Sequence, residues 1–314
     1  MAAGVVTPDG SLLSRLAAQT SCAADAEVLY QRLVGLLGAA LRESGVARSG
    51  VRGIGVGCGG PMIFPDGLVS PLNIPVWRDF PLRPRLEADF QVPVAVDNDA
   101  KAFALGEHWI GRGRGSRCLL AMVVSTGVGG GIVEGGRLID GAHGNAGHIG
   151  HVVVFPQGPR CACGARGCLE AVASGPNLAR QAALAIAGGA ASRIPPNAGG
   201  REIAAAAEAG DDLALRLFRR AGVALGRGIA AAAAVFDLDL VVVGGGVANA
   251  ARFFLPALQH ELRARAQLGF TRNLRVEVTT TTIETALAGA ARLVLSGLGE
   301  LEGCGPRAGR AVGQ

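Results

Sequence analysis

The sequence predicts an α/β protein. Short apolar runs that read as strands alternate with segments whose apolar residues recur at helical spacing. Several of these runs end in glycines or in a cluster of Asp and Asn, as strands do where a ligand binds at their carboxyl ends. With 314 residues, 49% of them hydrophobic, the chain can bury one large core or two smaller ones.

Apolar periodicity locates the elements of the first block. Pro8-Asp9-Gly10 stands between two apolar runs and is typical of a hairpin turn. Leucine, valine and alanine recur at helical spacing through 25–44. The expected order is strand 2–6, strand 11–15, helix 25–44, strand 51–57, a proline-rich loop to Pro75, helix 81–90, strand 92–96 and helix 100–110.

A second block follows a boundary that we expect near Asn98. Its distinguishing features are a glycine run after its first strand and a long alanine-rich helix. The expected order is strand 118–125, a glycine turn 127–131, a return strand 132–134, helix 176–188, a loop 188–200, helix 211–236, strand 238–243, strand 274–280, helix 284–299 and a disordered tail over 303–314.

Composition excludes several classes of function. The formal net charge is +5, and Lys101 is the only lysine among 30 basic residues. No long basic run or basic–aromatic interleaving indicates nucleic-acid binding. No apolar run is long enough to span a bilayer, and the N-terminus lacks the pattern of a signal peptide. We therefore expect a cytoplasmic protein that binds neither membrane nor nucleic acid.

Three cysteines in one short run predict a metal site. Cys161, Cys163 and Cys168 stand in C-A-C-G-A-R-G-C, with His151 ten residues upstream. Three thiolates and one imidazole are the ligand set of a closed, tetrahedral structural Zn²⁺ site. The alternatives are free thiols or a disulfide between two of the three. The other cysteines are scattered, which fits a reducing compartment: Cys22, Cys58, Cys118 and Cys304.

Two glycine segments that follow strands indicate a nucleotide site. The first is S-T-G-V-G-G-G at 125–131 and the second is Gly244-Gly245-Gly246. Backbone N–H groups in such segments can converge on phosphate oxygens, and the Ser125 and Thr126 hydroxyls add donors. The alternatives are a plain hairpin turn for the first and close helix–strand packing for the second.

Asp97-Asn98-Asp99 ends a strand and opens a helix. Phosphoryl transfer to an alcohol needs a carboxylate that accepts the hydroxyl proton, and a carboxylate at this position is suited to that role. The alternative is helix capping, which Asp and Asn side chains commonly provide.

Histidines crowd the segment before the cysteines. His143, His148 and His151 fall within nine residues, which favours ligand or substrate contacts over isolated packed side chains. Glu170 follows Cys168 by two residues, so a metal there would hold it in place; the alternative is a solvated helix start.

Taken together, these segments resemble the ROK family of repressors, open reading frames and sugar kinases over nearly all of 2–300. The most specific stretch runs from S-T-G-V-G-G-G-I-V at 125–133 through G-H-I-G-H at 147–151 to C-A-C-G-A-R-G-C-L-E-A-V-A-S-G at 161–175. The resemblance implies a two-lobed actin-like (ribonuclease H-like) ATPase fold with a sugar in the cleft. One lobe would be 1–97 completed by 284–300, the other 98–283, in a homodimer or tetramer.

The resemblance also implies roles for single residues. Asp99 would be the general base, and Mg²⁺-bound ATP the phosphoryl donor. The sugar-binding residues would be Asn73, Asn98, His148, His151 and Glu170. The Zn²⁺ ligands would be His151, Cys161, Cys163 and Cys168. The nucleotide-binding residues would be Thr126, Gly127, Gly129 and Gly130 on the phosphate side, and Gly245 and Gly246 on the adenosine side.

The sequence departs from the family pattern at two places. His148 stands where glucokinase-like members carry Glu, and G-H-I-G-H instead resembles bacterial N-acetylmannosamine kinases. The chain also begins just after the position of the family's D-x-G-G-T-K-like phosphate loop. We expect a cellular protein that starts upstream; without that loop we expect weak or absent kinase activity and partly retained sugar binding.

The expected activity is therefore ATP-dependent phosphorylation of a hexose. Glucose, phosphorylated at its 6-hydroxyl, is the first expectation because of the loop at 73–82, and N-acetylmannosamine is the second because of His148. Polyphosphate stays open as an alternative donor. The rival functions are a sugar-responsive transcriptional regulator, which in this family carries an additional helix-turn-helix domain, and a non-catalytic sugar-binding protein.

Overall fold

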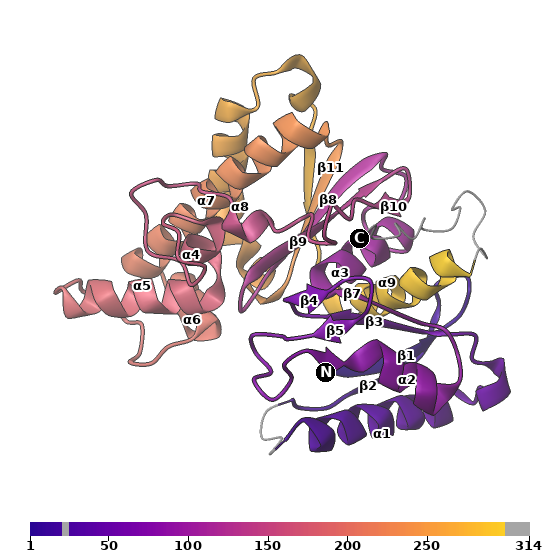
Figure 1. The fold of residues 1–314 in the computed structure, drawn as a ribbon. Coiled ribbons are helices and arrows are strands. Elements are labelled where there is room, and N and C mark those ends of the chain that lie inside the picture. The colour runs from indigo at the N-terminus through magenta and orange to yellow at the C-terminus, as the bar shows by residue number, and fades with distance from the viewer. Residues whose placement is uncertain (21–24, 299–314) are drawn as a thin grey trace. The chain divides into compact units, whose positions relative to one another are not determined.

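The structure, a computed structural model, describes residues 1–20 and 25–298 (Figure 1). It divides into two compact units. Of the described residues, unit 1 contains 1–20, 25–114, 136–146 and 283–298, and unit 2 contains 115–135 and 147–282. The tail expected at 303–314, together with Cys22 and Cys304, lies outside the described residues.

Unit 1 continues past the expected boundary at Asn98 as far as Arg114. The reason is helix α3 (Asp99–Trp109), which packs against strands β3 (Ile54–Cys58) and β7 (Val94–Asn98). These two strands pair in parallel, with Cys58 opposite Asn98. The α3 residues from Ala100 to Glu107 are all buried, so this helix belongs to the core of unit 1.

The remaining elements of unit 1 form a hairpin, a small sheet and covering helices (Figure 1). Asp25 caps the first long helix by accepting from the Val28 N–H, and Gly45 ends it at φ 72°. The elements are β1 (Ala2–Val6), β2 (Leu12–Ala17), α1 (Ala26–Ser44), a 3₁₀ turn (Arg48–Gly50), β4 (Met62–Ile63), β5 (Leu68–Val69), β6 (Phe80–Pro81), α2 (Leu82–Phe90) and α9 (Thr282–Gly297).

One part of this region differs from the sequence expectation. The segment expected as a proline-rich loop to Pro75 contains strands β4 and β5, which pair with β6 in a small antiparallel sheet. This sheet lies over an aromatic core in which the Trp77 and Phe80 rings stack with centroids 4.7 Å apart. Burial of these rings stabilises strands that are too short for a sequence pattern to reveal.

Glycines let helices α3 and α9 approach closely within unit 1. A Cβ on Gly106 would lie 1.6 Å from the Thr285 carbonyl oxygen, and one on Gly289 would lie 1.7 Å from the Ala102 carbonyl oxygen. Each helix therefore uses a glycine where the backbone of the other passes.

We expect Gly289→Ala to lower the free energy of unfolding by at least about 1–3 kcal/mol, because the added methyl group meets backbone that can move only with its helix. Gly297→Ala is the control on the same helix, since no atom lies within 4 Å of its added Cβ. Urea unfolding of both variants measures the difference. Equal stability of the two variants would contradict the close approach.

Unit 2 is organised around a mainly parallel sheet with an antiparallel hairpin (Figure 1). Within unit 2 the strand order is β9-β8-β11-β12, in which β8 pairs antiparallel with β9 and parallel with β11, and β11 pairs in parallel with β12. These strands are β8 (Cys118–Val124), β9 (Val128–Glu134), β11 (Leu240–Gly244) and β12 (Arg275–Val278), whereas β10 (Arg137–Leu138) falls in the 136–146 segment of unit 1.

Five helices and three short 3₁₀ segments complete the described part of unit 2. The segments are η2 (Ile149–His151), α4 (Leu169–Ala173), α5 (Gly175–Ala187), α6 (Gly200–Glu208), α7 (Asp212–Phe236), η3 (Gly246–Ala250), α8 (Ala251–Arg265) and η4 (Gly269–Thr271). Helices α7 and α8 pack closely because Gly222 and Gly226 of α7 leave room for the α8 backbone. The sequence expectation contained α5 and α7 but not α6 or α8.

The structure corrects the expected glycine turn over 127–131. Strand β9 begins at Val128, and Gly129 and Gly130 are strand residues opposite Val123 and Met122. A Cβ on Gly130 would lie 3.1 Å from the Gly147 carbonyl oxygen. These glycines therefore belong to a strand against which another stretch of backbone packs, a known use of glycine within sheets.

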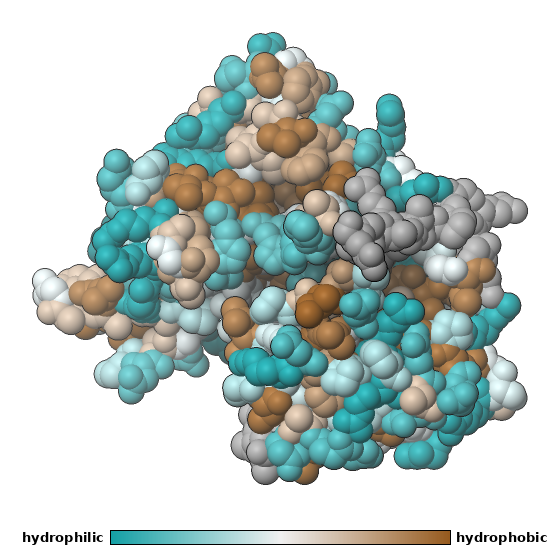
Figure 2. Space-filling model, viewed as in Figure 1, coloured by the Kyte–Doolittle hydropathy of each residue, from teal (hydrophilic) through white to brown (hydrophobic). Residues whose placement is uncertain are grey.

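Hydrophilic and apolar side chains alternate over the face shown in Figure 2, as on most protein surfaces. Among the described residues, no helix combines the length and the apolar character that crossing a bilayer requires.

Candidate functional site

The β7–α3 junction of unit 1 holds the predicted general base. Asn98 is the N-cap of α3, and its Oδ1 accepts a hydrogen bond from the Ala100 N–H at 2.9 Å. Asp99 is the first helical residue, and its Oδ1 accepts from the same N–H at 2.8 Å. The capping alternative is thus realised by Asn98, while Asp99 holds its carboxylate at the positive end of the helix dipole.

A glycine loop brings Asn73 and Asn98 together. Because β3 and β7 are parallel, the loop after Cys58 begins beside Asn98. A Cβ on Gly59 would lie 3.6 Å from Asn73 Oδ1, and one on Gly60 would lie 3.9 Å from Asn98 Nδ2. Both asparagine side chains therefore border the same short backbone segment, as sugar-binding residues would have to.

Asp99 also lies beside the end of β3, because a Cβ on Gly57 would lie 3.8 Å from the Asp99 Cβ. Burial first, and then the negative charge of Asp99, raises the pKa of Cys58 to about 12. The thiol is therefore protonated at neutral pH and is no nucleophile. It serves as a small apolar neighbour of the carboxylate.

Charged residues whose contacts with one another could not be read from the sequence surround this junction. The Asp97 side chain is 1% exposed, and its Oδ1 accepts from the Asn98 N–H at 2.7 Å and from Lys101 Nζ at 2.9 Å. Asp140 also pairs with Lys101. The usable sequence signal was the chain's only lysine, two residues after the Asp97-Asn98-Asp99 cluster, at the start of an apolar helix where a charge needs an acidic partner.

In unit 2, Glu170 is held against the turn between β8 and β9. Its Oε2 accepts a hydrogen bond from the Val128 N–H at 2.9 Å. A Cβ on Gly127 would lie only 2.7 Å from the same oxygen, so a side chain at position 127 would displace this carboxylate. Glu170 sits at the start of α4, and its fixed carboxylate borders Gly127 of the predicted nucleotide segment.

The second glycine segment lies beside the same turn. Gly244 ends β11 opposite Val123 of β8. Gly245 has φ 96° and donates its N–H to Thr282 Oγ1 at 3.1 Å, and a Cβ on Gly246 would lie 3.6 Å from Ser125 Oγ. The structure thus places both glycine segments at the carboxyl ends of neighbouring parallel strands, where open α/β sheets bind ligands.

The four predicted metal ligands form one cluster. The ligand atoms of His151, Cys161, Cys163 and Cys168 all lie within 4.8 Å of one another. Cys161 Sγ is 3.8 Å from His151 Nδ1, and Cys163 Sγ is 3.7 Å from Cys168 Sγ. Ligands of a tetrahedral Zn²⁺ stand about 3.5–3.8 Å apart. The donor set and its spacing therefore fit a metal such as zinc.

The backbone of this segment is folded to present the thiols. The Cys161 N–H donates to the Ala165 carbonyl at 2.8 Å, and Gly164 and Gly167 have φ 94° and 73°. Burial raises the pKa of Cys168 to about 12, whereas the Ala165 backbone N–H lowers the pKa of Cys163. A bound divalent cation would deprotonate both thiols outright.

The histidines separate into two groups. The His148 and His151 rings stack, with centroids 6.3 Å apart and an interplanar angle of 19°. His143 belongs to the 136–146 segment of unit 1 instead. A metal bound to His151 would fix the orientation of that ring, and therefore also the ring face against which His148 stacks.

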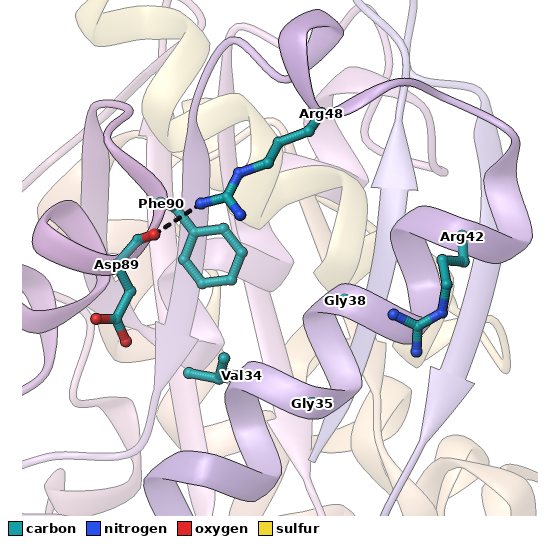
Figure 3. A pocket seen from close by; sticks show the side chains of 7 residues that line it. All are labelled: Val34, Gly35, Gly38, Arg42, Arg48, Asp89 and Phe90. Atoms are coloured by element: carbon teal, nitrogen blue, oxygen red, sulfur yellow. Dashed lines mark hydrogen bonds between the residues drawn. The ribbon is translucent and has the colours of Figure 1, made fainter.

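A separate cavity on unit 1 contains none of the predicted site residues (Figure 3). It is an open pocket of about 470 Å³, bordered by Val34, Gly35, Gly38, Arg42, Arg48, Asp89 and Phe90. Arg48 donates to the Asp89 carbonyl oxygen at 2.8 Å and lies over the Phe90 ring (Figure 3). Of the two arginines that border this pocket, Arg48 therefore already contacts the Asp89 carbonyl oxygen and the Phe90 ring.

Known proteins resemble the chain over most of its length. The sequence profile of the ROK family matches residues 1–296. A glucokinase of Halalkalibacterium halodurans is 38% identical over 70% of this chain and 69% of its own. An N-acetylmannosamine kinase of Citrobacter koseri is 40% identical over 62% of this chain and 63% of its own.

A crystal structure shares the fold. It is that of a ROK family glucokinase from Streptomyces griseus in complex with glucose and AMPPNP. That protein is 32% identical, with a TM-score of 0.76 over 92% of this chain and 94% of its own. The actin-like ATPase fold expected from the resemblance is thereby confirmed, and the chain belongs to the ROK family.

Proposed function

We propose that the protein transfers a phosphoryl group from ATP to a hydroxyl of a hexose. The observation that carries the proposal is Asp99 at the N-terminus of α3, next to Asn98 and the Gly59–Gly60 loop. Kinship with a glucokinase and with an N-acetylmannosamine kinase supports the same reaction class, and the glucokinase structure with glucose and AMPPNP supports ATP as donor.

The chemistry follows from the groups in unit 1. Asn98 and Asn73 bind sugar hydroxyls and orient one of them toward Asp99. The Asp99 carboxylate accepts the proton of that hydroxyl, and the hydroxyl oxygen of the sugar forms a bond to the γ-phosphorus. The bond between the γ-phosphorus and the bridging β-phosphate oxygen breaks, which releases ADP. Mg²⁺ that accompanies the nucleotide would neutralise the charge of the phosphates.

Unit 2 supplies the proposed nucleotide site. The Thr126 hydroxyl and the Gly127 backbone bind the phosphates, and Gly245 and Gly246 lie on the adenosine side. The adjacency of Ser125 and Gly246 supports this assignment. Gly129 and Gly130 lie in β9, and Gly130 lets the Gly147 backbone pack against this strand.

Glucose, phosphorylated at its 6-hydroxyl, is the first proposed substrate. Asn73 supports it, because the loop at 73–82 resembles that of glucokinase-like members and reaches the Gly59 segment. N-acetylmannosamine is the second, because the imidazole of His148 can donate as well as accept hydrogen bonds. Glu170 and His151 complete the proposed sugar contacts.

A panel of hexoses and N-acetylhexosamines, assayed for ADP release with ATP and for sugar phosphate with polyphosphate, tests the proposal. We expect turnover with glucose and ATP, and we expect the glucose kcat/KM to exceed that of N-acetylmannosamine. Calorimetric titration with each sugar runs in parallel. Sugar binding without turnover would instead support a non-catalytic sugar-binding protein, and retention of DNA in a shift assay a regulator.

Three finer assignments accompany the proposed activity. The Cys₃His cluster holds a structural Zn²⁺, and thiol ligation suits a reducing cytoplasm. The protein forms a homo-oligomer, which apolar side chains exposed on unit 2 support: Leu184 is 67% and Val235 75% exposed. Light scattering on the assayed sample measures the assembly.

A further inference from the structure

The only lysine of the chain is buried in unit 1. The Lys101 side chain is 1% exposed, although lysine is rarely enclosed unless its charge is paired. It lies in the first turn of α3, two residues after Asp99. The proposed function gives it no role in binding or in proton transfer.

Three acceptors surround the Lys101 ammonium. Nζ lies 2.9 Å from Asp97 Oδ1, 2.8 Å from Asp140 Oδ1 and 3.1 Å from the Gly144 carbonyl oxygen. The Phe64 ring adds an aromatic face, with its centroid 5.5 Å from Nζ. An ammonium has three donors, so these acceptors match its capacity.

The acceptors come from two different segments of unit 1. Asp97 ends β7, and the oxygen that binds Lys101 also accepts from the Asn98 N–H at 2.7 Å. Asp140 and Gly144 belong to a loop that closes on itself, because the Ala146 N–H donates to the Asp140 carbonyl oxygen at 3.0 Å. The ammonium therefore joins the helix start that carries Asp99 to the 140–146 loop.

We propose that Lys101 is a positioning residue for the phosphoryl transfer. This inference rests on the proposed function. Lys101 fixes the Asp97–Asn98 backbone, and with it the direction of the Asn98 and Asp99 side chains. It also holds the 140–146 loop, from which the chain continues to His148. A compact ammonium suits acceptors converging on one point better than the planar fork of arginine, which every other basic residue of the chain carries.

Two variants separate this role from simple charge neutralisation. Asp140→Ala removes the loop anchor and leaves the buried Lys101–Asp97 pair intact. Lys101→Met combined with Asp97→Asn removes both charges of that pair, so the protein folds without an isolated buried charge. Glu27→Ala is the control, because it removes the acidic partner of another unit 1 ion pair, that of Arg85.

We expect Asp140→Ala to raise the KM for sugar about tenfold, with kcat and the KM for ATP within about twofold of the unaltered protein. We expect the double variant to unfold in a cooperative thermal transition, as a folded protein does, but to lose about a hundredfold in kcat. The reason is that the start of α3, which carries Asp99, is then no longer held by the Lys101–Asp97 ion pair. Hydrogen exchange over 139–146 should quicken in both variants, and Glu27→Ala should change none of these quantities.

Folded variants with unchanged kinetic constants would overturn the positioning role, as would unchanged exchange over 139–146. Failure of the unaltered protein to phosphorylate any sugar is a different result, because it rejects the proposed function itself.

Discussion

Asp99→Asn is expected to lower kcat by about 10²–10⁴-fold while sugar affinity stays within a few-fold of the unaltered value. The asparagine side chain keeps the size of Asp99 and an oxygen that can accept from the Ala100 N–H, so the helix start is preserved. What it loses is the ability to take a proton from the sugar hydroxyl. Steady-state kinetics and calorimetric titration with glucose measure the two effects.

A matched control exists at another helix start. Asp212 is the first residue of α7, as Asp99 is of α3, and it is exposed. Asp212→Asn makes the same chemical change at the same helical position and should leave kcat unchanged. If Asp99→Asn turned over sugar at a near-normal rate, the base would have to be another group.

Cys168→Ser is expected to abolish metal binding and to destabilise the protein. Cys168 is fully buried, and a serine oxygen is a poor substitute for a thiolate on zinc. A loss of about 3 kcal/mol would lower the melting temperature by roughly 4–6 °C if the whole chain unfolds in one transition. Elemental analysis and thermal unfolding, with and without a chelator, report both quantities.

Cys118→Ser is the control for this experiment. Cys118 is also buried, but it lies on β8 and its Sγ donates to the Phe236 carbonyl oxygen, a bond that a hydroxyl can replace. This variant should keep one zinc per chain. Retention of zinc by Cys168→Ser, or a chelator-insensitive melting temperature in the unaltered protein, would argue against a structural metal.

The sequence pattern predicted those helices and strands whose own residues carry a strong local signal. The long helix expected at 211–236 is observed as α7, with Asp211 as its cap and Asp237 in the left-handed conformation at its end. The helix at 176–188 and the strand at 238–243 are likewise found, as α5 and β11 with shifted ends. Such elements carry strong periodicity or a continuous apolar run.

Elements that depend on distant partners were missed. Helix α8 contains Pro256, which breaks a helical pattern in sequence, yet the helix forms because it packs on the glycine face of α7. The glycines at 129–131 look like a turn, but β8 supplies the pairing that makes them a strand. Tertiary contacts outweighed local preference in both cases.

The candidate site divides in the same way. The sequence identified the Cys₃His cluster, whose members lie within one short segment and can be recognised by spacing alone. It did not identify the pair of Lys101 and Asp140, because they are 39 positions apart in the sequence and only the fold brings them into contact. Asn73 was recognised only through its family resemblance, and its closeness to the Gly59 segment is a product of the small β4-β5-β6 sheet region.

A crystal structure of the protein with glucose and a non-hydrolysable ATP analogue tests the central claim most directly. The account predicts a carboxylate oxygen of Asp99 about 2.6–3.2 Å from the sugar hydroxyl that faces the γ-phosphate, with Asn98 on a neighbouring hydroxyl. A sugar bound away from Asp99, or one whose phosphate-facing hydroxyl is held by a different carboxylate, would contradict it.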